Sequence, residues 1–137
     1  MTSIGIDIGG TKSLAVRLDG AAVEASSHVE HGTDQGTVAS IGDAVERVAD
    51  GTERAIGVGI AGLVSVESRT LAWGPHVPGT NLAVGAELQE RFGLPVVVDN
   101  DANVALYAEM RIGAAVGYRN VLLVTLGTGI GGAIAAD

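Results

Sequence analysis

The chain has 137 residues, carries a formal net charge of −8 and contains no cysteine. This length fits one domain with an ordinary core, and the negative charge disfavours binding to nucleic acids or anionic membranes. The lack of cysteine excludes disulfides and thiolate zinc sites, while an apolar content of 47% argues against disorder. Because the sequence shows neither a signal-peptide pattern nor a bilayer-spanning apolar run, we expect a soluble cytoplasmic protein.

The first part of the chain predicts three antiparallel strands. Ile4, Ile6 and Ile8 alternate with small or acidic residues, and this period of two is typical of a strand with one buried face. Similar alternation follows two glycine-containing turns, of which the second, Asp19-Gly20, is a hairpin signal. The strands are expected over residues 3–8, 12–18 and 21–29.

The rest of the chain predicts helices that alternate with strands. An apolar stripe of helical period predicts the first helix, for which Thr33 or Asp34 is the expected cap, and Gly93 is expected to end the second. Helices are expected over residues 35–49, 82–92 and 102–112. Buried strands are expected over 55–61 and 96–98, a further strand over 120–126, short paired strands within 63–73, and a loop over 74–81.

This order of elements predicts the fold class. Three antiparallel strands followed by crossover strands indicate an α/β protein with a mixed sheet and helices on both faces, of the ribonuclease H-like type. Ligands of such sheets collect at the carboxyl ends of the crossover strands. The glycine turns and Asp101 are expected to meet there.

The segment from Asp7 to Lys12 has the residue types of a phosphate-binding loop. Gly9 and Gly10 permit positive φ and close approach of a ligand, while Thr11 and Lys12 supply a hydroxyl and an ammonium group. Lys12 is the only lysine in the sequence. Asp7, inside a strand, needs a partner or a metal, because burying an isolated charge costs roughly several kcal/mol. A plain hairpin tip, with the aspartate bonded to loop amides, is the alternative.

Two further glycine-rich segments, 57–62 and 127–132, match the G-x-G-x-x-G pattern of dinucleotide-binding proteins. Neither segment has the context that this pattern needs, which is a preceding strand, a following helix and an acidic residue placed to bind ribose. We therefore reject a dinucleotide-binding fold. The sequence also lacks G-x-x-x-x-G-K-[ST], so Lys12 is not the lysine of a P-loop.

Two carboxylates flank the junction between a buried strand and a helix. Asp101 could act there as a general base or could cap the helix, and Asp99 is a second candidate for either role. Asn81 and Asn100 carry amides that could both donate to and accept from hydroxyl groups, or could instead stabilise turns. The histidines show no metal-ligand spacing and are expected at the surface: His28, His31 and His76.

Five segments, in this order and spacing, resemble the ROK family of sugar kinases, which includes bacterial glucokinases. The segments are Asp7-Ile-Gly-Gly-Thr-Lys12, Gly59-Ile-Ala-Gly62, Pro78-Gly-Thr-Asn81, Asp99-Asn-Asp-Ala-Asn103 and Leu126-Gly-Thr-Gly-Ile-Gly-Gly132. ROK kinases fold as two actin-like lobes that close on sugar and ATP, and this chain resembles the N-terminal part of one. The resemblance implies an N-terminal actin-like lobe over residues 1–118 and the truncated beginning of a second lobe over 119–137.

The resemblance also implies roles for individual residues. Asp101 matches the catalytic base and also a sugar-binding position. The other matches to sugar-binding positions are Asn81, Asn100 and Gly62. Asp7 matches the carboxylate near the magnesium ion of MgATP. The ATP phosphates are assigned to Gly9, Gly10, Thr11, Lys12, Gly127, Thr128, Gly129 and Gly131. The family's zinc motif lies beyond the second glycine loop and has no counterpart in this sequence.

The expected function is the ATP-dependent phosphorylation of a hexose, with glucose as the first candidate, at a primary hydroxyl. The alternatives are a catalytically inactive fragment and a sugar-sensing ROK regulator without its DNA-binding domain. The expected partners are a hexose and MgATP, with no nucleic acid and no membrane. Because a strand over 120–126 would expose apolar surface, we expect that segment to be disordered or buried against another molecule, which leaves a homo-oligomer open.

Overall fold

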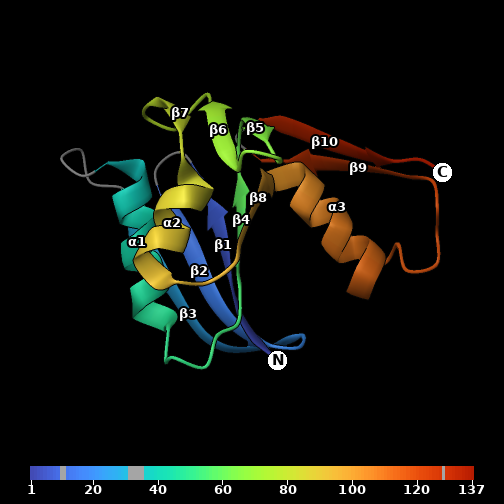
Figure 1. Cartoon of the computed structure of the whole chain (residues 1–137). Coiled ribbons are helices and arrows are strands. Elements are labelled where there is room, and N and C mark those ends of the chain that lie inside the picture. Colours follow the sequence, from blue (N-terminus) through green and yellow to red (C-terminus); the bar gives the residue numbers. More distant parts are fainter. Residues whose placement is uncertain (10–11, 31–35, 128) are drawn as a thin grey trace.

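A five-stranded mixed sheet forms the centre of the computed structural model, which describes residues 1–9, 12–30, 36–127 and 129–137 (Figure 1). The strand order is β3-β2-β1-β4-β8. The first three strands pair antiparallel, and β1–β4 and β4–β8 pair parallel. Their bounds are Thr2–Ile8 (β1), Lys12–Asp19 (β2), Ala22–Glu30 (β3), Ile56–Ile60 (β4) and Val96–Asn100 (β8). The predicted fold class is confirmed.

Two helices cover one face of the sheet, and their contact with it forms the main core. Helix α1 (Thr37–Val48) packs on β1, β2 and β3, and α2 (Val84–Phe92) packs on β8. Gly93 ends α2 in the left-handed conformation, as predicted. The N-cap position of α1 is Gly36, without a side-chain hydrogen bond, so the expected cap is wrong. The expected capping residues Thr33 and Asp34 lie outside the described residues.

Helix α3 (Asp101–Ile112) lies on the opposite face of the sheet (Figure 1). Gly59 of β4 has no side chain on this face, so the helix can approach the strand closely. A Cβ atom on Gly59 would lie 3.6 Å from Cα of Asp101 and 3.6 Å from Cβ of Val104. The first turn of α3 therefore sits directly above β4.

A small three-stranded sheet follows β4 and forms one wall above the carboxyl ends of the parallel strands (Figure 1). It consists of β5 (Leu63–Ser65), β6 (Thr70–Trp73) and β7 (Thr80–Leu82). The paired strands predicted within 63–73 are confirmed. The loop predicted over 74–81 is wrong at its end, because Thr80 and Asn81 belong to β7, which pairs with β6.

The last segment is an antiparallel hairpin of β9 (Val121–Leu126) and β10 (Ile130–Ala135). Among the residues that the structure describes, it pairs with neither of the other sheets. One face packs against α3, where Ala102, Leu106 and Ala133 are buried. Its outer face is exposed and apolar: Leu122, Val124, Leu126, Ile130 and Ile134. The alternative of a disordered segment is wrong for its described residues, and β10 is an element that the sequence patterns did not predict.

Within the described ranges, no helix is both long enough and apolar enough to cross a membrane.

Candidate active site

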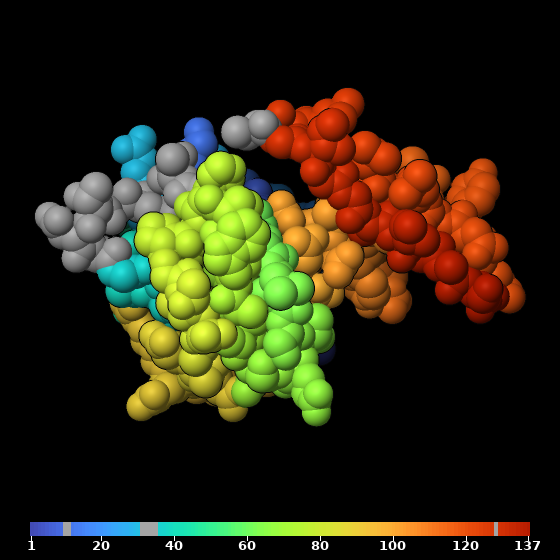
Figure 2. Space-filling view, turned by 90° about the horizontal axis from the view of Figure 1, so that it is seen from above, coloured from blue at the N-terminus to red at the C-terminus, as the bar shows by residue number. Residues whose placement is uncertain are grey.

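A cleft of about 780 Å³ opens where the five-stranded sheet, the small sheet and the hairpin meet. Figure 2 shows it as the hollow between the small sheet and the hairpin, seen from above. It is lined by Gly9, Ala61, Gly62, Pro75, His76, Asn100, Asp101, Thr125, Leu126, Gly127, Gly129, Ile130 and Gly131. Seven of these were predicted site residues, so the structure brings most of the described candidates together: Gly9, Gly62, Asn100, Asp101, Gly127, Gly129 and Gly131.

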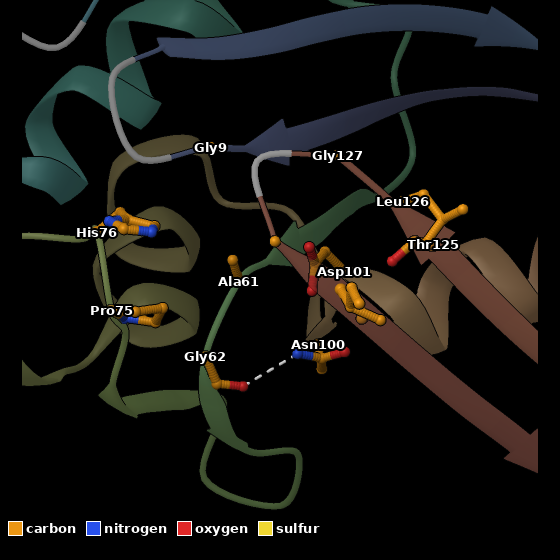
Figure 3. A pocket seen from close by; sticks show the side chains of 13 residues that line it. Gly9, Ala61, Gly62, Pro75, His76, Asn100, Asp101, Thr125, Leu126 and Gly127 are labelled. Atoms are coloured by element: carbon orange, nitrogen blue, oxygen red, sulfur yellow. Dashed lines mark hydrogen bonds between the residues drawn. The ribbon is translucent and has the colours of Figure 1, made fainter.

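Asn100 is the N-cap of α3. Its side-chain oxygen accepts hydrogen bonds from the backbone N–H groups of Ala102, at 2.9 Å, and Asn103, at 3.4 Å. Its Nδ2 donates to the carbonyl oxygen of Gly62 at 3.1 Å, which joins the helix to the end of β4 (Figure 3). Two of the first free N–H groups of the helix are thereby satisfied. One Nδ2 hydrogen remains, so Asn100 can still donate to a ligand, but its acceptor is already used twice.

The two neighbouring aspartates have different surroundings. Asp99 Oδ1 accepts from the backbone N–H of Asn100 at 2.6 Å and from Nδ2 of Asn103 at 3.0 Å. Asp99 does not line the cleft, whereas Asp101 does (Figure 3). Because Asn100 caps the helix, the alternative role of either aspartate as the cap is wrong. Of the two aspartates, Asp101 is therefore the one whose carboxylate faces the cleft.

We expect Asn100→Ala to lower the free energy of unfolding by about 1 kcal/mol, because the cap of α3 is lost. Asn100→Ser is the matched control, since serine keeps a capping oxygen and loses only the donation to Gly62. Urea denaturation of both variants measures the difference. Equal losses for alanine and serine would show that the bond to Gly62, and not the cap, carries the stabilisation.

Asp7 lies on the face of the sheet that carries α3, next to Gly59 on the neighbouring strand, and Asp101 lies above that glycine. Asp7 is not among the residues that line the cleft. Asp7 is an exposed residue, so the inference that its strand position buries it is wrong. Neighbouring protein atoms still remove part of the water around its carboxylate, which raises its pKa, and the negative charge of Asp101 raises it further. The two carboxylates are therefore close enough to interact.

We expect Asp7→Asn to stabilise the fold at pH 7 without added metal. A raised pKa means that the folded state binds the proton more tightly, so folding stability falls as pH rises from 3.8, the ordinary value, through the folded-state pKa. The stabilisation should thus be present at neutral pH and vanish below about pH 3.8. The measurement is thermal unfolding of the unchanged chain and the variant at several pH values between about 3 and about 7. A variant that is less stable at pH 7 would contradict it.

Described residues of both glycine loops line the cleft: Gly9 of the first, and Gly127, Gly129 and Gly131 of the second. The N–H of Gly9 donates to the carbonyl of Lys12 at 3.0 Å, and the N–H of Gly127 donates to the carbonyl of Gly129 at 2.9 Å. A Cβ atom on Gly131 would lie 2.5 Å from Oγ1 of Thr125, so the Thr125 side chain would have to move to make room for it. Lys12 begins β2 and is exposed, and it does not line the cleft. The predicted residues Gly10, Thr11 and Thr128 lie outside the described residues.

Comparison with known proteins decides the family. The family model described as "ROK family" matches residues 3–137. The chain belongs to the ROK family. The glucokinase of Streptomyces coelicolor is 40% identical over 135 residues, which cover 96% of this chain and 43% of that protein. The glucokinase of Thermotoga maritima is 33% identical over 139 residues, covering 96% of this chain and 43% of that protein.

Solved ROK structures share the fold of this chain. A ROK glucokinase from Streptomyces griseus, in complex with glucose and AMPPNP, superposes with a TM-score of 0.90 at 37% identity. This match covers 99% of this chain and 45% of that one. A ROK hexokinase from Thermus thermophilus superposes with a TM-score of 0.85 at 32% identity, covering 99% and 47%. The chain is thus glucokinase-like and spans less than half the length of these relatives, as expected for the N-terminal portion of a ROK protein.

In this ROK chain, the cleft lining includes His76 and does not include Asn81. Asn81 lies in β7, is exposed, has a φ of 53° and does not line the cleft. His76 is also exposed, as predicted, but it lies in the cleft wall beside Pro75 (Figure 3). The sequence offered one indication of this position, which is that His76 lies two residues before the Pro78–Asn81 motif. Spacing of that kind does not predict whether the imidazole faces the cleft.

Proposed function

We propose that this ROK chain takes part in the ATP-dependent phosphorylation of a hexose at a primary hydroxyl, with glucose as the hexose. The observation that carries the proposal is that one cleft holds Asp101 and both glycine loops, through Gly9, Gly127 and Gly129. Phosphoryl transfer to a hydroxyl requires a held acceptor, a bound phosphate and a carboxylate that takes the proton. The glucose and AMPPNP bound by the Streptomyces griseus relative support the same pair of substrates here.

In the proposed reaction, the oxygen of the sugar's primary hydroxyl bonds to the γ-phosphorus of ATP, and Asp101 accepts the proton of that hydroxyl. The bond between that phosphorus and the bridging oxygen breaks, and ADP leaves with the electron pair. Asn100 donates a hydrogen bond to a sugar hydroxyl through its remaining Nδ2 hydrogen, beside Gly62. A general base of this kind contributes about 10²–10⁴-fold to the rate.

The glycine loops bind the phosphates in this proposal. Backbone N–H groups without side chains beside them allow a phosphate to approach closely. Residues Gly9, Gly10, Thr11 and Lys12 form the first loop, and Gly127, Thr128, Gly129 and Gly131 form the second. Within the first loop, Lys12 supplies a positive charge.

Asp7 fits a magnesium ion of MgATP in part. Carboxylate oxygens suit Mg²⁺, which is bound in such sites by one or two carboxylates together with phosphates and water. Among the described residues there is no cluster of three or more acidic or histidine side chains that could hold a metal by itself. When bound, Mg²⁺ neutralises the charge of the phosphates.

We further propose that residues 1–118 form one actin-like lobe and that 119–137 begin a second. The hairpin β9–β10 supports this division, because it forms a separate sheet among the described residues and packs on α3. Its apolar outer face, with Leu126 at 81% and Ile130 at 82% exposure, favours a second candidate function. In this alternative the chain by itself is an inactive fragment that binds ligand without turnover.

The test is incubation of this chain with MgATP and a mixed pool of hexoses, followed by mass spectrometry of the sugars. Asp101→Asn is the control. A hexose phosphate that forms with the unchanged chain and not with the variant supports the proposal and identifies the substrate. If no sugar gains phosphate, activity of this chain alone is contradicted and the inactive fragment is favoured.

A further inference from the structure

His76 forms part of the cleft wall that faces the start of α3. It lines the cavity together with Pro75, from the connection between β6 and β7. Asn100 and Asp101 line the same cavity from the end of β8 and the first position of α3. In Figure 3 the imidazole lies across the cavity from these two side chains, with Ala61 between them at the base. A ligand that spans the cleft from Asp101 to the opposite wall would meet His76 there.

The backbone on both sides of this imidazole is held in place. A Cβ atom on Gly74 would lie 2.7 Å from the carbonyl oxygen of Ala61, so the chain here lies directly against the end of β4. Val77 is only 5% exposed and packs into the main core. Oγ1 of Thr37, in α1, donates a hydrogen bond to the carbonyl of Pro78 at 3.1 Å. The imidazole is thus presented to the cleft by an anchored segment.

The hydrogen-bonding capacity of the opposite wall is restricted. Asn100 retains only a donor, because its oxygen already accepts from Ala102 and Asn103. Asp101, when ionised, is only an acceptor. A neutral imidazole carries one donor and one acceptor nitrogen, so it can bind a hydroxyl group in either role. His76 therefore adds a capacity that neither group across the cleft provides.

We propose that His76 contacts the hydroxyl groups of the sugar and helps to determine which hexose binds. This inference rests on the proposed function, because it requires a sugar held by Asp101. An exposed hydrogen-bonding side chain on an anchored backbone distinguishes hydroxyl configurations, since an isomer with a hydroxyl on the wrong side leaves the imidazole without its partner. The competing role is contact with a phosphate held at Gly9, which lines the same cleft.

The test is a nuclear magnetic resonance titration of the isotope-labelled chain with glucose, and separately with MgATP. Side-chain signals of His76 and Asp101 are followed, and His28 serves as an internal control because it lies exposed on β3, away from the cleft lining. We expect glucose to shift the signals of His76 and Asp101 with one dissociation constant and to leave His28 unchanged. His76→Ala should weaken glucose binding by about tenfold, as expected for a lost hydrogen bond, whereas the matched variant His28→Ala should not change it.

The outcomes separate this inference from the proposed function. If glucose shifts Asp101 but not His76, and His76→Ala binds glucose as the unchanged chain does, the inference is overturned and the sugar site stands. A response of His76 to MgATP but not to glucose would overturn the inference in favour of a phosphate contact. If glucose shifts neither residue, the proposed sugar site and the inference both fail.

Discussion

Asp101→Asn should lower phosphoryl transfer from MgATP to glucose by about 10²–10⁴-fold, while glucose affinity changes by less than about tenfold. Asparagine has nearly the same shape and keeps an oxygen acceptor, so contacts with the sugar persist, but it cannot take the proton of the attacking hydroxyl. The structure favours a loss of rate without a loss of folding or affinity, because the Asp101 side chain lines the cleft and the capping of α3 depends on Asn100. Single-turnover mass spectrometry gives the rate, and glucose titration gives the affinity.

Asp99→Asn is the matched control for this experiment. Asp99 lies two residues earlier, and its Oδ1 accepts hydrogen bonds from Asn100 and Asn103, which an amide oxygen can also accept. We expect turnover within about tenfold of the unchanged chain, since no proton transfer is assigned to Asp99. A large loss of turnover in Asp99→Asn, with Asp101→Asn active, would move the role of base from Asp101 to Asp99.

The main sheet could be predicted because local patterns and tertiary packing agree there. Ile4, Ile6 and Ile8 alternate along β1, and all three are buried in the core cluster that includes residues of α1 and α2. Strand β10 was not predicted because its sequence, Ile130–Ala135, is rich in glycine and alanine and lacks β-branched alternation. It forms a strand because β9 pairs with it and because Ala133 packs on α3, and neither contact can be read from a local window.

The positions of candidate site residues could be predicted where a motif directly follows a strand. Asp101 and Gly62 follow strands, so their place at the carboxyl edge of the sheet follows from the topology. The side chains of Asn81 and His76 lie in or next to an irregular connection, and long-range contacts determine which of them faces the cleft. The hydrogen bond from Thr37 to Pro78 and the close packing of Gly74 are such contacts, and no local pattern predicts them.

Gly62→Ala should lower the free energy of unfolding by about 3 kcal/mol or more, because the change combines overpacking with backbone strain. Gly62 has a φ of 145°, and a Cβ atom there would lie 2.3 Å from the carbonyl oxygen of Trp73 and 2.8 Å from Cα of Gly74. Both are backbone atoms, so a rotamer change cannot relieve the clash. A loss of this size is a large part of the total stability of a domain, which is about 5–15 kcal/mol.

Gly20→Ala is the matched control, because Gly20 also has a positive φ, of 59°, but has open space around its Cβ position. We expect it to cost about 1 kcal/mol, the strain of a left-handed backbone alone. The difference between the two variants in urea denaturation measures how tightly the small sheet lies against the end of β4. This contact also bears on the chemistry, since the carbonyl of Gly62 accepts from Asn100, the cap of the helix that carries Asp101. If both variants lost the same stability, the backbone around Gly62 would have moved to accept the Cβ atom. The contact at Gly62 would then not fix the position of Asn100, and the placement of Asp101 would depend on the rest of α3.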